Sequence, residues 1–197
     1  MSRKEAILEA ALKLFNETNT QSATTNHIAK AMGISPGNLH YHYKNREEIV
    51  RLLYKRLREE AFLGFEELPR TIQELQGHEK LLIALQWKYR FFFKEMLFLF
   101  SRDSVLEEMY IKDNIAHRER ISHSMRLFEE QGELSFPDES SFEFVVDSIL
   151  LSWQFYASYL HTLGKTLDEA GVVQSVTHTH SAMKPYMTYP ESKNEKT

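Results

Sequence analysis

Apolar residues recur along this chain three or four positions apart, which is the spacing of helices. Residues 3–18 are typical, because the apolar side chains form one stripe and the charged side chains occupy the other positions. No stretch shows the alternation of period two that a half-buried strand requires. The chain contains only seven Gly and five Pro, few for a protein with many tight turns. We therefore predict an all-α protein.

Two short helices are predicted after a polar stretch at residues 16–22. Thr24 or Thr25 is a suitable N-cap for the first of them. Gly33 follows, at the position where helices commonly end in a left-handed residue. Ser35 and Pro36 then supply an N-cap and a first-turn proline, so a second helix begins at once. Two short helices joined by a Gly-containing turn of three or four residues describe a helix-turn-helix.

The second short helix, predicted over residues 36–43, has an unusual surface. Leu39 and Tyr43 lie four positions apart and would anchor one face inward. The other side chains suit DNA, because Asn can read adenine and Tyr or His can bind phosphates or stack on base edges. These side chains are Asn38, His40, Tyr41 and His42. The alternative interpretation is that they only cap and cover a surface helix.

A further helix is predicted to begin directly behind the helix-turn-helix. Asn45 and Glu48 have the spacing of a capping box. Lys44 and Arg46 stand beside this helix start, where free backbone N–H groups can help them to hold a phosphate. These two residues therefore extend the predicted DNA-binding surface.

Taken together, these residues resemble the DNA-binding signature of TetR-type transcriptional regulators. The resemblance covers residues 3–50 and is carried by Thr25, Ile28-Ala29, Gly33-Ile34-Ser35, Gly37-Asn38-Leu39, His42-Tyr43 and Arg46-Glu47. It implies a three-helix DNA-binding domain at residues 1–46 and a helical effector-binding and dimerisation domain at 47–197, with about nine helices. The residues expected to contact DNA are Thr24, Thr25, Asn26, Ser35, Pro36, Gly37, Asn38, His40, Tyr41, His42, Lys44 and Arg46. His40 stands where the family usually has a phosphate-contacting Tyr, and it is a candidate for the same contact.

The remaining sequence predicts six further helices. The helix after Asn45 continues through Phe65 until Pro69 breaks the pattern, and a polar bridge spans residues 70–77. Helices are then expected at 79–100, 104–110, 113–131, 138–163 and from 166 to about 185. Ser104 with Glu107 and Thr166 with Glu169 are predicted to cap two of them. We expect the polar tail at 191–197 to be disordered.

Two segments, 82–100 and 142–160, are apolar nearly all round and must be buried on two sides. For the second segment, one side is expected to pack against a partner subunit. The resemblance implies a four-helix interface across a two-fold axis, and thus a homodimer through residues 140–163 and 166–187. Such a dimer suits palindromic double-stranded operator DNA with half-sites about 34–36 Å apart.

The resemblance also implies a small-molecule pocket among the middle helices, lined by aromatic and aliphatic side chains. The apolar candidates are Trp87, Phe91, Phe128, Trp153 and Tyr156, with Arg90 or His117 as polar anchors. Such a pocket favours a small, largely apolar effector. The implied function is that of a repressor which this effector releases from its operator.

Composition and charge agree with this picture. Residues 1–60 hold ten Lys/Arg against seven Asp/Glu, whereas the remainder holds fourteen against twenty-one, so a basic head precedes an acidic body. There is no Cys, which excludes disulfides and thiolate zinc sites. The most apolar run, 91–100, has ten residues where a membrane span needs about 20. With no secretory pattern at its start, the chain is expected to be cytoplasmic, without membrane contact and without a cofactor.

Two other function classes compete with a DNA-binding regulator. An enzyme is disfavoured because phosphate-loop, nucleophile-elbow and zinc-protease motifs are absent from the sequence. His178 and His180 lie two positions apart on a predicted helix and would point in different directions. An adaptor or coactivator that keeps the fold for protein contact is the remaining alternative. The polar face of the second short helix favours DNA.

Overall fold

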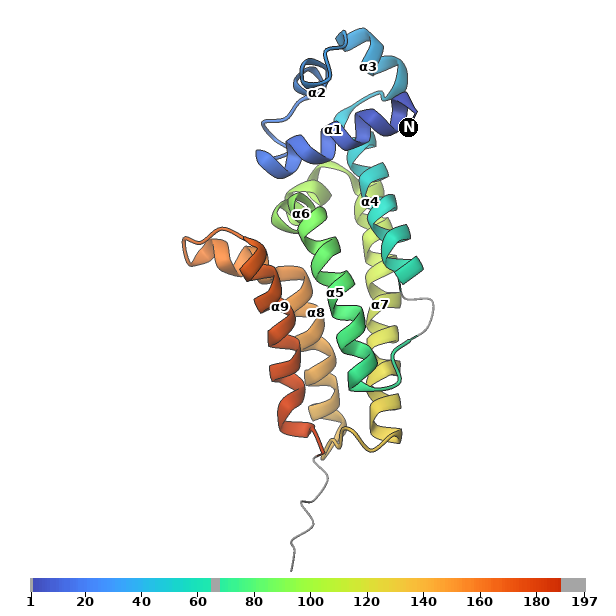
Figure 1. Cartoon of the computed structure of the whole chain (residues 1–197), viewed down its shortest axis with the longest axis vertical. Coiled ribbons are helices and arrows are strands. Elements are labelled where there is room, and N and C mark those ends of the chain that lie inside the picture. Colours follow the sequence, from blue (N-terminus) through green and yellow to red (C-terminus); the bar gives the residue numbers. More distant parts are fainter. Residues whose placement is uncertain (1, 65–67, 189–197) are drawn as a thin grey trace, which may run out of the picture.

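A computed structural model describes residues 2–64 and 68–188 of the chain, which form nine α-helices and one 3-10 helix. Helices α1 (Arg3–Glu17), α2 (Thr25–Ala31) and α3 (Pro36–His42) gather at one end of the molecule (Figure 1). The others are α4 (Arg46–Gly64), α5 (Ile72–Lys88), α6 (Arg90–Arg102), α7 (Ser104–Glu130), α8 (Glu139–Thr162) and α9 (Glu169–Met183). The all-α prediction is confirmed. The predictions for Phe65 and for the tail at 191–197 lie outside the described residues.

The first three helices fold as their caps predict. Thr24 and Ser35 accept hydrogen bonds from the backbone N–H of His27 and Asn38, at the starts of α2 and α3. Gly33 between these helices has φ of +66°, a conformation that costs a residue with a Cβ about 1–2 kcal/mol. The helix-turn-helix geometry therefore follows directly from local sequence.

One hydrophobic cluster joins the head, which is α1 to α3 with the start of α4, to the near end of the body, which is α5 to α9. The inward residues of α1 to α4 are fully buried in it, namely Ile7, Ile28, Leu39 and Ile49. Phe15 on α1 packs against Phe91 on α6, with ring centroids 5.4 Å apart. The head and α6 therefore share one hydrophobic core. The division at residues 46 and 47 stays a prediction.

The long helices α5, α7, α8 and α9 run side by side away from the head (Figure 1). A second hydrophobic cluster at their far ends contains Ile72, Met125, Phe128 and Phe142. The 3-10 helix Lys184–Tyr186 follows α9 and closes this end. None of the described helices is long and apolar enough to cross a membrane.

The predicted helix at 79–100 was wrong, because the structure has two helices there. The bridge at 70–77 is largely helical, since Thr71 caps α5 and buries Ile72 beneath it. The chain then breaks at Tyr89, and the side chain of Asn16 fills the break. Asn16 donates to the Lys88 carbonyl at 2.8 Å and accepts from the Phe91 N–H at 3.1 Å. A contact 75 residues away in sequence therefore stabilises the break.

The two helices predicted at 104–110 and 113–131 were also wrong, because α7 is continuous. No Gly or Pro lies between Tyr110 and Asp113, so nothing interrupts the backbone ladder. The N-caps of α7 and α9 are Asp103 and Asp168, one residue or more away from the predicted Ser104 and Thr166. An aspartate at these positions accepts the N-terminal N–H group directly.

Candidate nucleic-acid interface and effector cavity

Helix α3 presents an exposed face between two buried anchors. Leu39 and Tyr43 are buried, and the Tyr43 hydroxyl donates to the Lys4 carbonyl at 3.0 Å, so α3 is fixed against α1. Tyr41 points outward with 85% of its surface exposed, and its ring meets the His42 ring edge-on at 5.1 Å. The Tyr41 side chain is therefore available for contact with another molecule.

Most of the predicted DNA contacts lie on the surface of this head. The exposed ones are Thr24, Asn26, Ser35, Pro36, Gly37, Asn38, His40, Tyr41 and Lys44, and the partly buried ones are Thr25, His42 and Arg46. They come from α2, α3, the first residue of α4 and the turns next to these helices (Figure 1). Their contacts with DNA stay a prediction.

Arg46 differs from the others because its guanidinium is engaged within the protein. It donates to the Thr20 carbonyl at 2.6 Å and to the Glu47 carboxylate at 3.0 Å, leaving the side chain 19% exposed. In this position Arg46 holds the turn between α1 and α2. Its charge still lies beside the head surface, but its guanidinium donates inward.

The same turn is held from α6. The backbone N–H of fully buried Thr20 donates to the Glu95 carboxylate at 2.9 Å, and the Thr20 hydroxyl donates to the same group. We call Thr20, Arg46 and Glu95 the Thr20 latch. Sequence reasoning missed Thr20 and Glu95, because nothing in their local sequence indicates a contact 75 positions apart.

Further polar contacts fix α4 to the body. Arg51 and Asp103 form an ion pair at 2.7 Å, and the Tyr54 hydroxyl donates to Asp113 at 2.9 Å. Burial and the Asp113 carboxylate raise the pKa of Tyr54 well above its usual range. These pairs lie where α4 leaves the head, so the orientation of α4 depends on α7.

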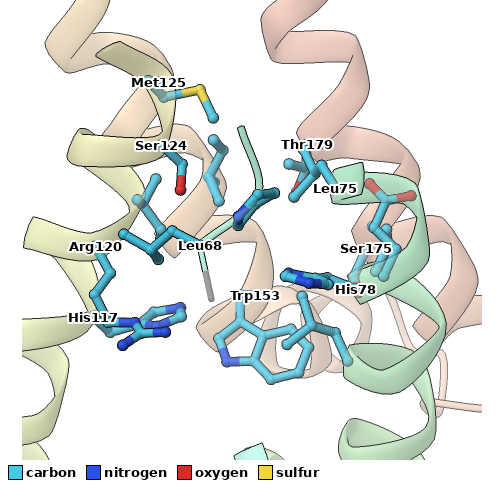
Figure 2. Close-up of a pocket in the computed structure, with 16 residues that line it drawn as sticks. Leu68, Leu75, His78, His117, Arg120, Ser124, Met125, Trp153, Ser175 and Thr179 are labelled. Carbon is cyan, nitrogen blue, oxygen red and sulfur yellow. The ribbon is translucent and has the colours of Figure 1, made fainter. Parts of the chain in front are cut away.

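A cavity of about 100 Å³ lies among α5, α7, α8 and α9 (Figure 2). Its apolar walls come from all four helices and include Leu75, Leu82, Ile121, Met125, Ile149, Trp153 and Val176. Polar lining side chains are His78, Glu79, His117, Arg120, Ser124, Ser175 and Thr179. The cavity is therefore mainly apolar, with a limited set of polar groups, as small-molecule sites usually are.

Of the seven predicted pocket residues, His117 and Trp153 line this cavity. Arg90 stacks over the Trp87 ring at 4.2 Å, and Phe91 is buried against α1. Phe128 belongs to the core at the far end, and Tyr156 contacts Tyr159 and His178. The other five are not among the residues that line the cavity.

Charge inside the body is partly neutralised. His180 on α9 forms an ion pair with the Glu79 carboxylate, and this contact raises the pKa of His180. Burial and the neighbouring charge of Arg120 lower the pKa of His117 to about 4. His117 is therefore neutral near pH 7. The histidines at 178 and 180 contact different partners, Tyr156 and Glu79, as their spacing predicts.

One face of α8 carries apolar side chains that the single chain leaves exposed. Phe144, Leu151 and Tyr159 are 61%, 58% and 53% exposed and recur seven and eight positions apart. Val173 on the neighbouring α9 is also exposed. This face has the spacing of a helix surface that packs against another helix.

The first three helices form a helix-turn-helix unit, and the helical body behind them encloses a cavity. Comparison with known proteins identifies the family. The model described as "Bacterial transcriptional repressor" matches residues 46–194, and that for "Bacterial regulatory proteins, tetR family" matches residues 7–53. The chain belongs to the TetR family and is a DNA-binding transcriptional regulator. Its relatives are regulators and not enzymes.

Individual relatives are distant. The biofilm operon negative transcriptional regulator IcaR of Staphylococcus epidermidis is 26% identical over 82% of this chain and 87% of its own length. The regulator UidR of Escherichia coli is 26% identical over 67% and 68%. A solved TetR-family regulator from Marinobacter aquaeolei has a TM-score of 0.85 at 23% identity, covering 95% of this chain and 92% of its own.

Proposed function

We propose that the protein is a homodimeric repressor that binds a palindromic operator through α3 and is released by a small effector in the body cavity. The single observation that carries the DNA-binding role is the outward Tyr41 on α3, exposed between the buried Leu39 and Tyr43. The relatives support repression, since IcaR is described as a negative regulator. An adaptor that acts through protein contact would not need the exposed polar side chains of α3.

The exposed apolar face of α8 supports dimerisation. Phe144, Leu151 and Tyr159 would meet the same face of a second copy, with α9 beside it, through residues 140–163 and 166–187. Two copies related by a two-fold axis present two α3 helices, which a palindromic operator requires. Burial of these side chains offsets the cost of association.

Release would proceed through α5 and α6. Side chains of α5 line the cavity, and a single residue, Tyr89, separates α5 from α6. Helix α6 carries Glu95, which belongs to the Thr20 latch. An effector that prefers a shifted α5 would thus move the turn before α2 and, with it, the spacing of the two α3 helices. The effector acts only through its difference in affinity between the two arrangements.

Fluorescence anisotropy across a salt series, with duplexes tiled from the DNA upstream of the gene, tests the DNA-binding role. We expect tight, salt-sensitive binding to one near-palindromic tile. Lys44→Ala should lower the slope of log K against log salt by about 1, whereas the exposed body lysine variant Lys112→Ala should not.

Tyr41→Ala should weaken binding to that tile by about tenfold or more, because it removes a contact to the DNA. Uniform weak binding to every duplex, unaffected by Tyr41→Ala, would contradict the proposal and favour the adaptor alternative.

A further inference from the structure

We infer that Glu60 on α4 sets the angle of the head, and that through this angle it makes the protein specific for one spacing of the operator half-sites. The inference rests on the proposed function, because half-site spacing matters only for a dimer on a palindromic operator. Its support is a closed series of polar contacts that joins α1, α4 and the junction between α5 and α6.

Glu60 lies at the centre of these contacts. The ammonium group of Lys88 lies 2.7 and 2.8 Å from the two carboxylate oxygens of Glu60, and the Tyr89 hydroxyl donates to one of them at 2.9 Å. Tyr89 is the residue between α5 and α6 and is fully buried. Burial raises the pKa of Glu60, but the hydrogen bonds from Lys88 and Tyr89 hold it below its usual value. A charged carboxylate therefore fixes α4 to the junction.

The contacts continue from Glu60 to the head. Arg56, one turn earlier on α4, donates to Glu60 at 3.3 Å and forms an ion pair with Glu9 on α1. Asn16, two turns after Glu9 on α1, donates to the last carbonyl of α5 and accepts from an N–H of α6. The series therefore leaves α1 at one residue and returns to α1 at another. We call the Glu60 brace the set of Glu9, Asn16, Arg56, Glu60, Lys88 and Tyr89.

A closed series of contacts resists a tilt of the head. Because the Glu60 brace is attached to α1 at two points, a tilt about α4 must stretch at least one of its hydrogen bonds, and the charge-assisted ones are strong. The ion pairs of α4 with α7 differ, since Arg51 with Asp103 and Arg58 with Asp113 involve no residue of α1. The Thr20 latch ties the head to α6. Of the latch and the brace, the brace alone includes a residue of α5, the helix that lines the cavity.

The angle of the head decides where α3 meets the DNA. One base pair added at the centre of a palindrome moves the half-sites apart by about 3.4 Å and turns them by about a tenth of a helical turn. Two rigid heads cannot follow this change, whereas heads that tilt can. Loss of the Glu60 contacts should therefore relax the spacing requirement and leave the surface of α3 unchanged.

Three duplexes test the inference: the operator obtained by selection, and the same operator with one base pair inserted or removed at its centre. We expect the unaltered protein to bind the selected operator at least about tenfold more tightly than either of the others. Glu60→Gln keeps the size of the side chain and removes its charge. It should lower this ratio by about fivefold or more, the difference between a charge-assisted and a neutral hydrogen bond. Tyr89→Phe removes only the hydroxyl and should lower the ratio in the same direction.

Glu59→Gln is the matched control, because Glu59 is the exposed glutamate next to Glu60 on α4, and it should leave the ratio unchanged. A loss of folded protein lowers the apparent affinity for all three duplexes equally, so a purely structural role of Glu60 would not change the ratio. If Glu60→Gln fails to fold, Tyr89→Phe gives the same comparison.

A second measurement needs no DNA. The chain has no Cys, so Lys13→Cys places one nitroxide label on the exposed side of α1 in each subunit. Pulsed electron resonance then gives the distance between the two heads of the dimer. We expect one narrow distribution, which Glu60→Gln broadens and Glu59→Gln does not.

The outcomes separate the inference from the proposed function. Equal binding of the three duplexes by the unaltered protein would overturn the inference, and so would Glu60→Gln and Tyr89→Phe proteins that keep both the spacing preference and the narrow distribution. Each of these results leaves the proposed function intact. No coupling between labels, or no selected operator, would refute the proposed function and the inference with it.

Discussion

The Thr20 latch makes the sharpest prediction, because one carboxylate on α6 satisfies two donors in the head. Glu95→Ala removes the acceptor of the Thr20 N–H, at 2.9 Å, and of the Thr20 hydroxyl. Thr20 is fully buried, so its N–H is left without this partner and away from water. Hydrogen bonds to charged groups contribute about 1.5–3 kcal/mol each, and we expect Glu95→Ala to cost roughly 3 kcal/mol of unfolding free energy.

Thr20→Val isolates the smaller part of this effect. It keeps the backbone N–H bond and removes only the hydroxyl, so we expect a loss of about 1–2 kcal/mol. In the double variant the two losses should not add, because they share one contact. Urea unfolding at fixed protein concentration measures all three values, and operator affinity should fall in parallel as the turn before α2 loosens.

Glu108→Ala is the control, since Glu108 is an exposed glutamate on α7 and its loss should change stability by less than about 0.5 kcal/mol. If Glu95→Ala matched this control in both stability and operator affinity, α6 would not hold the head, and the route from cavity to DNA described above would be refuted.

Three further outcomes are expected. Gly33→Ala should destabilise the protein by about 1–2 kcal/mol, because Gly33 has φ of +66°, whereas Gly37→Ala inside α3 should stabilise it slightly; thermal melting compares the two. Leu151→Glu should give monomers in light scattering and abolish operator binding, and a dimer that persists would exclude the α8 face. The pKa of His117 is about 4 in the folded protein and about 6.5 in the unfolded chain, so the free energy of unfolding should fall as the pH drops from about 6.5 to 4. The pKa of His180 is raised in the folded protein, so the free energy of unfolding should also fall as the pH rises above about 6.5. Replacing His117 by Asn should flatten the acid side and replacing His180 the basic side; unchanged profiles in urea unfolding would contradict this.

The head could be predicted in detail because its signals are local. Thr24, Gly33, Ser35 and Pro36 each specify a cap or a turn within a few residues of themselves. The outward position of Tyr41 follows from the inward positions of Leu39 and Tyr43 on one short helix. The caps and the turn agree with the sequence pattern, whereas the contacts of Thr20 with Glu95 and of Arg46 with Thr20 are tertiary and have no local signal.

For the body, the sequence predicts the all-helical class and the positions of α8 and α9, but not the bounds of α5, α6 and α7. The break at Tyr89 depends on the Asn16 amide, which no local pattern near residue 89 reveals. The sequence pattern assigns aromatic residues to the pocket because aromatics commonly line small-molecule sites. The structure places Phe91 and Phe128 in the core instead, where large side chains fill space between helices. The polar lining, Arg120 included, depends on how four helices face one another.

The most direct test of the central claim is selection of the purified protein against a random pool of duplex DNA. The account predicts enrichment of a near-palindromic sequence with half-site centres about 34–36 Å apart, and loss of that enrichment for Tyr41→Ala. Recovery of no preferred sequence by the folded dimer would contradict it and would leave protein contact as the use of the exposed α3 face.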